Sequence, residues 1–512
     1  MANTEITDQI EAGAIAGSAT PVPLGRTAFE GAIHTGVSQL VRALLLIAST
    51  VVVARILTPD DYGVIAMAAP VLAFVLLFQD LGLSAVTIQA RTISDEQSNT
   101  LFWVTLAASA GVTLLLLAVS PLVSWFYQDA RIGYITAASA AIVIITGAGL
   151  QHLALLTREL RFRAVARVVL VGAVLNFLAT IGLAFWLRSY WAILFGNVAG
   201  AAAQSVAAWT SQNWRPSRRA SLRRTGAMLK FGGALAGFDI LNFFSRNMDN
   251  ILIGRIWGAG PLGLYDRSYS LMMAPIQLIR APVARVMLPV MTRLVDRPDR
   301  YRLAYLSSLR AVLLLTAPAA AVAIATSNEL VPLLLGDRWN GASPIFFWLA
   351  LGSLYLPVAS STGVLFISTG RGRSLLLWGV FSSITTILAF AVGLSWGPTG
   401  VAKAYVGATL LQTLIVVPWA ARGTAVRASD IASLFAPFLA AAGGIWLVVG
   451  ALQGTMEPAL VIAASLPPAY LGTAFLLALF PEGRAFLVST VQLVKETVAG
   501  QRRGALAASN EG

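Results

Sequence analysis

Long apolar runs separated by short polar breaks dominate the chain. A run of roughly 20 mostly apolar residues is what an α-helix needs to cross the hydrocarbon core of a bilayer. The chain of 512 residues contains fourteen such runs, at about 34–57, 63–86, 100–122, 134–156, 164–187, 190–212, 231–256, 264–291, 303–326, 343–367, 374–395, 399–420, 430–451 and 458–480. The pattern predicts an all-α integral membrane protein with about 14 transmembrane helices.

The basic residues between these runs are distributed unevenly. The even-numbered breaks and the two tails hold 23 Arg and Lys residues, whereas the odd-numbered breaks hold five: Arg55, Arg131, Arg188, Arg255 and Arg338. Short cytoplasmic loops of membrane proteins carry such an excess of basic residues. We therefore expect a multi-pass membrane protein with both termini in the cytoplasm.

Composition supports a membrane protein and excludes several other classes. Hydrophobic residues make up 57% of the chain and charged residues 12%, against about 25% charged residues in soluble domains. The net charge of +13 lies mostly in the short loops, where it meets lipid headgroups, and we expect no nucleic-acid partner. The chain has no cysteine. Its two histidines, His34 and His152, are interpreted as polar residues at interfacial helix ends, so no metal site or cofactor is expected.

Two longer breaks and the C-terminal tail interrupt the pattern. The break at 213–230 is strongly basic, and the break at 327–342 is interpreted as a small interfacial element anchored by Trp339 on the outer side. After Pro481, apolar residues recur at helical spacing from Leu487 onward. This tail is expected to form an amphipathic helix on the cytoplasmic leaflet.

An internal repeat relates the two halves of the chain. Residues 55–64 match residues 255–264 at an offset of 200: Arg55-Ile56-Leu57 and Tyr62-Gly63-Val64 correspond to Arg255-Ile256-Trp257 and Leu262-Gly263-Leu264. Parallel repeats of this kind are a transporter architecture. We expect a cytoplasmic tail (1–28), an N-lobe of six spans (29–213), a basic loop (214–230), a C-lobe of six spans (231–420), a C-terminal helix pair (421–480) and an amphipathic tail (481–512).

Several cations lie inside the predicted spans. Arg42, Arg246, Arg280 and Arg310 are deepest, and Lys403 is intermediate. An arginine at the bilayer centre costs roughly 2.5–3.5 kcal/mol on insertion scales. Two interpretations stay open: these side chains line a water-filled cavity, or they form structural ion pairs between helices.

The seventh span carries a polar stripe. Asp239, Asn242, Arg246 and Asp249 fall within about 80° of one another around an ideal helix. Arg246 and Asp249, three residues apart, are candidates for an ion pair. Asp239 and Asp249, with Asn242 beside them, are therefore either ion-coupling residues or members of structural pairs.

Three stretches of the chain resemble a known family. They are Asp80-Leu81-Gly82-Leu83-Ser84-Ala85, then Ser245 to Arg255 followed by Leu262-Gly263-Leu264-Tyr265-Asp266-Arg267, and Pro282 to Pro289. These stretches resemble bacterial polysaccharide exporters, which are lipid-linked oligosaccharide flippases of the multidrug/oligosaccharidyl-lipid/polysaccharide exporter superfamily. The colanic-acid-exporter type is the most similar, and the resemblance covers residues 29–420.

The resemblance implies two six-helix lobes around a central cavity and a location in the bacterial inner membrane. It also implies export of a polyprenyl-diphosphate-linked sugar repeat unit by alternating access. It makes Arg42 the candidate for an essential first-span arginine, and relates the two extra helices to a lipid-tail groove. Arg42, Arg246 and Arg310 are expected to contact the diphosphate, with Arg280 and Lys403 as further cavity residues. The polymerase and export machinery of the pathway are further candidate partners.

Other functions were weighed against export of a lipid-linked oligosaccharide. A multidrug cation antiporter of the same superfamily needs acidic cavity residues, yet the spans hold eight basic and four acidic residues. A membrane enzyme, such as a polysaccharide polymerase or ligase, needs a sizeable catalytic loop, and no break between the spans is long enough. A peptidoglycan-precursor flippase differs only in the sugar. We expect a transporter rather than an enzyme.

Overall fold

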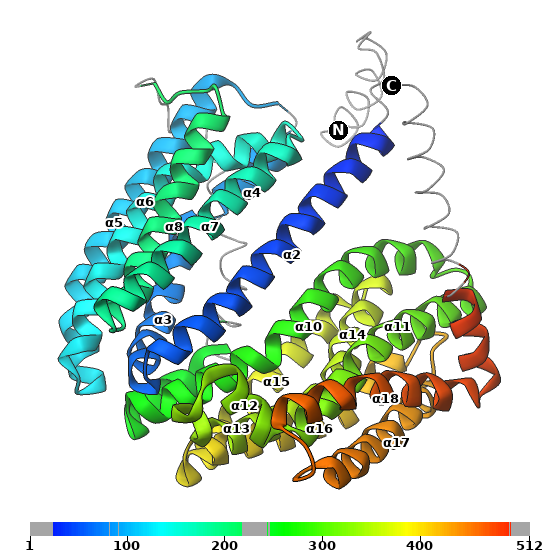
Figure 1. Cartoon of the computed structure of the whole chain (residues 1–512). Coiled ribbons are helices and arrows are strands. Elements are labelled where there is room, and N and C mark those ends of the chain that lie inside the picture. The colour runs from blue at the N-terminus through cyan, green and yellow to red at the C-terminus, as the bar shows by residue number, and fades with distance from the viewer. Residues whose placement is uncertain are drawn as a thin grey trace, which may run out of the picture.

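The protein is helical throughout the part that its computed structural model describes. That part comprises residues 24–80, 82–90, 92–217, 243, 246–490 and 492, without the side chains of 24–35, 280–282, 284 and 285. The N-lobe contains α2 (Leu24–Ile56), α3 (Pro59–Asp80), α4 (Leu83–Gln89), α5 (Asp95–Tyr127), α6 (Ala130–Arg158), α7 (Phe162–Leu187) and α8 (Trp191–Ser211). These helices form the upper-left bundle in Figure 1, and α2 is its long diagonal member.

The C-lobe follows from residue 246 onward. It contains α10 (Ala259–Leu294), α11 (Pro298–Ala325), α12 (Ser327–Leu335), the 3-10 helix η2 (Asp337–Ala342), α13 (Ser343–Ser353), α14 (Leu356–Ser368), α15 (Gly372–Gly393), the 3-10 helix η3 (Leu394–Trp396) and α16 (Gly397–Ala421). Two more helices, α17 (Ala428–Leu452) and α18 (Pro458–Ala478), pack on each other and on α11. The predicted all-α membrane architecture is confirmed.

Eleven helical stretches in the described part are long and apolar enough to cross a membrane. One of them, Gly372–Ala421, is 50 residues long and contains both α15 and α16. The helix α10 has 36 residues but is not among the eleven. The predicted seventh span, 231–256, lies largely outside the described residues. The count of fourteen spans therefore stays a prediction.

Two spans predicted as continuous helices are broken. The span expected at 63–86 ends as α3 at Asp80, because Gly82 adopts a left-handed φ of 71° before α4 begins. The Oδ1 of Asp80 accepts hydrogen bonds from the amide (3.0 Å) and the hydroxyl (2.7 Å) of Ser84, so these residues of the Asp80–Ala85 stretch form a turn. The span expected at 343–367 divides into α13 and α14 at residues 354–355, next to Pro357, which lacks a backbone donor.

Two predicted interfacial residues are instead buried. Trp339 was expected at the membrane surface, yet it is fully buried and its indole N–H donates to the carbonyl of Ala54 at 2.8 Å. His152 is also fully buried, with its ring stacked on Trp209 at 4.2 Å between centroids. Tertiary packing, which the apolar pattern does not report, covers both side chains.

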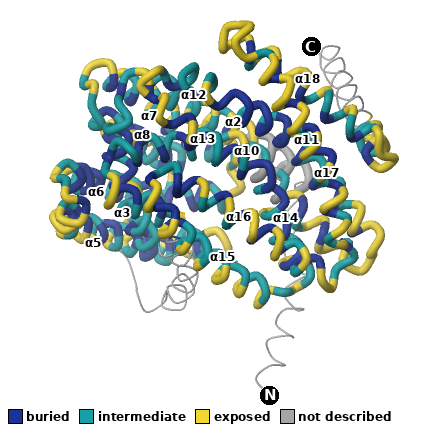
Figure 2. Tube along the Cα trace, turned by 90° about the horizontal axis from the view of Figure 1, so that it is seen from below, coloured by how far each residue is buried: buried dark blue, intermediate teal, exposed yellow. Residues whose placement is uncertain are grey.

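The two lobes meet at one end of the molecule. In Figure 1 they touch at lower left, where α3 and α10 begin, and diverge toward the upper right. We call the contact region the junction and define it as residues 54–63 of the N-lobe with residues 254–267 and 333–342 of the C-lobe. Its buried apolar side chains belong to a core that continues through both lobes, visible as the dark tube in Figure 2.

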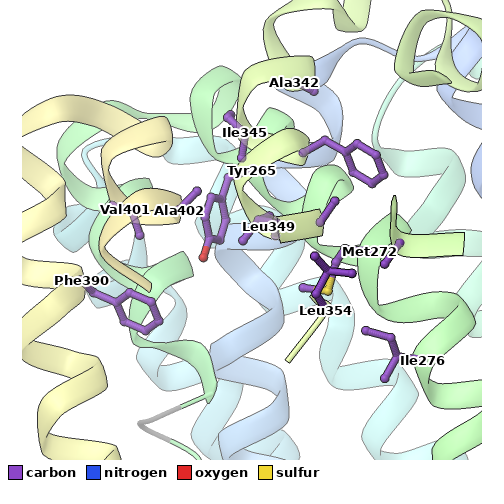
Figure 3. Close-up of a cluster of buried hydrophobic side chains, with 14 of the residues drawn as sticks. Tyr265, Met272, Ile276, Ala342, Ile345, Leu349, Leu354, Phe390, Val401 and Ala402 are labelled. Atoms are coloured by element: carbon purple, nitrogen blue, oxygen red, sulfur yellow. The ribbon is translucent and has the colours of Figure 1, made fainter. Parts of the chain in front are cut away.

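In the C-lobe this core packs α10 against α13 and α16. Tyr265 of α10 lies between Leu349 of α13 and the Val401–Ala402 pair of α16 (Figure 3). All four side chains are buried, with exposed fractions of 0%. This packing holds the first half of α10 in place, and α10 carries the C-lobe side of the junction.

Candidate functional site

The junction forms where α3 and α10 cross at close range. Two glycines, Gly63 and Gly263, stand at the crossing, and a Cβ atom on either would collide with the backbone of the other helix. Only glycine permits so close an approach of two helices. The two residues occupy matching positions of the predicted repeat, at the offset of 200.

The end of α2 is tied to the C-lobe by polar contacts. The Arg55 guanidinium donates to the carbonyls of Leu333 (2.5 Å) and Leu334 (3.4 Å) at the C-terminus of α12. A cation is favourable there because the last carbonyls of a helix lack intrahelical partners. The Trp339 ring packs edge-on against Tyr62 at 5.4 Å. Together these contacts close the junction around Ala54, whose carbonyl accepts from Trp339.

A third element of the junction is the Asp266–Arg267 pair of α10. The two side chains form an ion pair at 2.5 Å, and the Arg267 Cζ lies 4.6 Å from the centroid of the Tyr62 ring. A guanidinium over an aromatic face is attracted by the ring quadrupole. Both residues belong to the stretch that carries the family resemblance, so part of that stretch serves lobe-to-lobe contact.

The predicted polar stripe of the seventh span contains one buried carboxylate. Asp249 is 6% exposed, and its carboxylate accepts hydrogen bonds from the Tyr265 hydroxyl (3.0 Å) and the Asn250 amide (2.9 Å). Within the described residues it forms no ion pair with Arg246. Sequence reasoning missed Tyr265 as a partner, although both residues lie in the stretch that resembles the family. Asp239 and Asn242 lie outside the described residues.

Arg42 lies on the exposed face of α2. It stands 14 residues before Ile56, which is roughly 21 Å along a helix from the junction end. The helix packs on α7, and Arg42 is exposed together with Leu40 and Leu44. In the part of the chain that the structure describes, the Arg42 guanidinium has no hydrogen bond or ion pair.

Two further cations of the predicted set are also exposed. Arg246 lies one turn before Asp249. Lys403 of α16 is exposed, and its Nζ lies 5.4 Å from the centroid of the Trp348 ring of α13. Among the described side chains, neither cation has a carboxylate partner. Within that part of the chain, these charges are therefore not neutralised by an ion pair.

Arg310 differs from the other cations. Its guanidinium on α11 forms an ion pair with Glu482, just after α18, and its side chain is 12% exposed. The helical segment at 481–490 also places Leu487 against the buried core. This first part of the tail therefore packs on the C-lobe. The Arg280 side chain lies outside the described side chains, although its backbone lies within α10.

The charged groups suit recognition of an anion more than metal or acid–base chemistry. In the part of the chain that the structure describes, exposed Arg42, Arg246 and Lys403 are accompanied by one buried carboxylate, Asp249. Among the described residues, no group of three His, Cys, Asp or Glu side chains could hold a metal ion. Guanidinium groups bind phosphate and carboxylate through paired N–H donors.

The profile of a family described as "Polysaccharide biosynthesis protein" matches residues 52–344. The chain belongs to this family. The lipopolysaccharide biosynthesis protein WzxC of Escherichia coli (strain K12) is 23% identical over 389 residues, covering 75% of this chain and 79% of that protein. The succinoglycan biosynthesis transport protein ExoT of Rhizobium meliloti (strain 1021) is 23% identical over 368 residues, covering 72% and 74%. The family resemblance stated from the three sequence stretches is confirmed.

Solved structures of other proteins share the fold of this chain. The lipid II flippase MurJ, in an inward closed conformation, superposes with a TM-score of 0.70 at 11% identity, covering 87% of this chain and 98% of that one. An inward-facing transporter of the multidrug resistance MATE family gives a TM-score of 0.60 at 13% identity, covering 79% and 98%. The two-lobed transporter fold is thereby confirmed.

Proposed function

We propose that this protein is a flippase that moves a polyprenyl-diphosphate-linked oligosaccharide repeat unit across the bacterial inner membrane for exopolysaccharide or lipopolysaccharide biosynthesis. The observation that carries the proposal is the pair Arg42 and Arg246. Both guanidiniums are exposed without a carboxylate partner among the described residues, and both belong to predicted spans. The names of WzxC and ExoT, which refer to polysaccharide biosynthesis and transport, support this substrate class.

The physical task explains the need for unpaired cations. The diphosphate must cross about 30 Å of hydrocarbon, and an isolated charge entering a medium of low dielectric costs on the order of 20 kcal/mol by idealised solvation. An arginine meets phosphate oxygens with two parallel N–H donors and stays charged at any cellular pH. A hydrated cavity lined by arginines lowers this barrier, while the polyprenyl tail remains in the lipid.

The distribution of basic loops gives the proposed orientation. The junction holds Arg55 and Arg255 and lies at the ends of α2 and α10 that adjoin odd-numbered, weakly basic breaks. Under the positive-inside rule this end faces the periplasm. Both termini are then cytoplasmic, and the end at which the lobes diverge faces the cytoplasm, from which the lipid-linked unit would be loaded.

The remaining predicted site residues have subsidiary roles in the proposal. Lys403 and Arg280 are candidate sugar or phosphate contacts. Arg310 becomes available to a diphosphate only when Glu482 releases it. Asp249 is the candidate for ion coupling, with Asp239 and Asn242 as further members of its stripe. An inside-negative potential favours outward movement of an anion by roughly 2.3 kcal/mol per charge per 100 mV.

The alternative functions fit the charges less well. A cation antiporter of the multidrug type needs accessible carboxylates, whereas Asp249 is buried and hydrogen-bonded to Tyr265. A polymerase or ligase is expected to act downstream, as a partner that receives the exported unit. The antiporter would transport a cationic drug, and the polymerase or ligase would chemically modify the oligosaccharide. An experiment that follows each molecule therefore distinguishes these alternatives from the flippase.

Reconstitution of the purified protein in proteoliposomes tests the function. A fluorescent polyprenyl-diphosphate oligosaccharide is placed in one leaflet, and its appearance in the other is followed with an impermeant quencher. We expect translocation that protein-free vesicles lack and that a cationic drug does not inhibit. Efflux of the cationic drug without movement of the lipid-linked sugar would overturn the proposal in favour of the antiporter.

A further inference from the structure

Arg55 and Arg255 occupy matching positions of the repeat, and each reaches the opposite lobe. Arg55 donates to two carbonyls of α12. Arg255 lies over Phe126 near the end of α5, with its Cζ 5.8 Å from the ring centroid. The two arginines are equivalent by the offset of 200, but their partners differ.

The partners of Arg55 and Arg255 differ because the helix connections beside them differ in length. In the C-lobe the connection between α11 and α13 contains α12 and η2, and it supplies the acceptors for Arg55. In the N-lobe the connection between α5 and α6 is the short turn of Gln128 and Asp129. Across the described residues, no carbonyl or carboxylate accepts a hydrogen bond from Arg255, which is exposed.

An apolar pocket lies beside this contact, because Phe126, over whose ring Arg255 lies, is one of its lining residues. Its volume is about 400 Å³, which lies within the range of about 300–1,000 Å³ that is usual for ligand sites. Its lining comes from both halves of the chain and includes Pro70 and Phe74 of α3, Val119 and Tyr127 of α5, and Phe243 and Ile251 of the predicted seventh span. The segment of α5 that lines it extends for roughly 12 Å. The pocket therefore runs from the C-terminal end of α5 back along that apolar helix.

We infer that this interlobe pocket binds an acyl chain of an anionic glycerophospholipid whose phosphate rests on Arg255. The apolar, aromatic lining suits a hydrocarbon chain, and the guanidinium at the rim suits a phosphate. The lipid would provide the acceptor for Arg255 that α12 provides for Arg55. This inference concerns a resident lipid and holds whichever molecule the protein transports.

The location predicts a consequence for the lobes. Because Phe243 and Ile251 face α3 and α5 across the pocket, a bound chain touches both lobes. A ligand that contacts both lobes favours the state in which they are together. We therefore expect the anionic lipid to stabilise the closed junction.

Fluorescence quenching in nanodiscs tests the lipid site. Trp125 lines the pocket and is 75% exposed, so the difference between the wild-type and Trp125→Phe signals reports on the pocket. The nanodiscs consist of unbrominated phosphatidylcholine. In separate series, they are supplemented with phosphatidylglycerol or with phosphatidylcholine whose acyl chains are brominated. We expect phosphatidylglycerol to quench this signal with an apparent affinity roughly fivefold higher than that of phosphatidylcholine. This ratio corresponds to the attraction of about 1 kcal/mol between one basic residue and anionic lipid.

Matched variants separate the site from general charge effects. Arg255→Gln should abolish the preference for phosphatidylglycerol over phosphatidylcholine, and Arg255→Lys should retain it. Arg338 is an exposed arginine at the same end of the molecule, and Arg338→Gln should leave the preference unchanged. Val119→Phe should reduce quenching by both lipids by filling the pocket. Equal quenching by the two lipids in the wild type, or a preference that survives Arg255→Gln, would overturn the inference. Stronger quenching by a brominated polyprenyl phosphate would also overturn it, because the occupant would then be the carrier lipid.

Discussion

Gly63 and Gly263 face each other's helix in a reciprocal contact. A Cβ atom on Gly63 would lie 1.8 Å from the carbonyl oxygen of Ala259, and one on Gly263 would lie 1.8 Å from that of Pro59. Ala259 and Pro59 are themselves 200 residues apart, as are the two glycines. The glycine contacts of the junction are therefore related by an approximate two-fold symmetry within one chain. Isologous dimer interfaces show the same symmetry between two subunits.

Adding a methyl group at this crossing should open the junction. Gly63→Ala and Gly263→Ala are each expected to lower the apparent melting temperature in detergent and to reduce translocation, because overpacking typically costs about 1–3 kcal/mol. Gly182→Ala in α7 is the control, since a Cβ there meets nothing within 4 Å. A junction variant as stable and active as that control would show that the close crossing is dispensable.

The indole of Trp339 should contribute to stability through its hydrogen bond as well as its bulk. Trp339→Phe leaves the ring packing largely intact but removes the donor to Ala54, and a buried unpaired acceptor costs about 1–3 kcal/mol. Differential scanning fluorimetry should show a lower melting temperature for this variant. Trp186→Phe, at a side chain that is 80% exposed, should leave the melting temperature unchanged. Equal shifts in both variants would contradict the role of the hydrogen bond.

The Arg310–Glu482 pair separates a structural role from a substrate role. If the pair holds the segment after α18 on α11, then Arg310→Glu should lower stability and the double variant Arg310→Glu/Glu482→Arg should restore part of it. The expected coupling is about 1 kcal/mol or less, because Glu482 is 67% exposed. If Arg310 instead binds the diphosphate, the reversed pair restores stability but not translocation. Measuring both quantities in the same four proteins distinguishes the two roles.

The architecture was predictable because its causes are local. Apolar length sets the spans, and the asymmetry of basic loops predicts their orientation. The repeat at 55–64 and 255–264 indicated that Gly63 and Gly263 are equivalent. The sequence could not show that they touch each other's helices, because that depends on how two lobes dock.

What the sequence missed depends on contacts between distant residues. Trp339 has the amphipathic character of an interfacial anchor, and only its hydrogen bond to Ala54 reveals its burial. The membrane adds a further ambiguity, because apolar residues face lipid as readily as they face the core. Hydropathy therefore cannot distinguish exposed Arg42 from paired Arg310. The break after Asp80 was similarly hidden, since Leu81 and Leu83 continue the apolar run on either side of Gly82.

Neutralising the buried carboxylate of the seventh span should test ion coupling. Asp249→Asn preserves the side-chain volume and the acceptor for Tyr265 but removes the charge. If Asp249 couples transport to an ion, this variant should lose the stimulation by a proton or sodium gradient while still binding substrate. Tyr265→Phe serves as the comparison, because it removes the hydrogen bond and keeps the charge. Unchanged gradient dependence in Asp249→Asn would restrict Asp249 to a structural role.

Binding of the lipid-linked diphosphate to arginine variants tests the central claim most directly. The affinity of a polyprenyl-diphosphate oligosaccharide is measured for the wild type, Arg42→Gln, Arg246→Gln and the control Arg338→Gln, with melting temperatures recorded for each. A hydrogen bond to a charged group contributes about 1.5–3 kcal/mol, so Arg42→Gln and Arg246→Gln should each weaken binding by roughly tenfold or more, while Arg338→Gln binds as the wild type does. Folded Arg42 and Arg246 variants that bind the diphosphate with wild-type affinity would contradict the account.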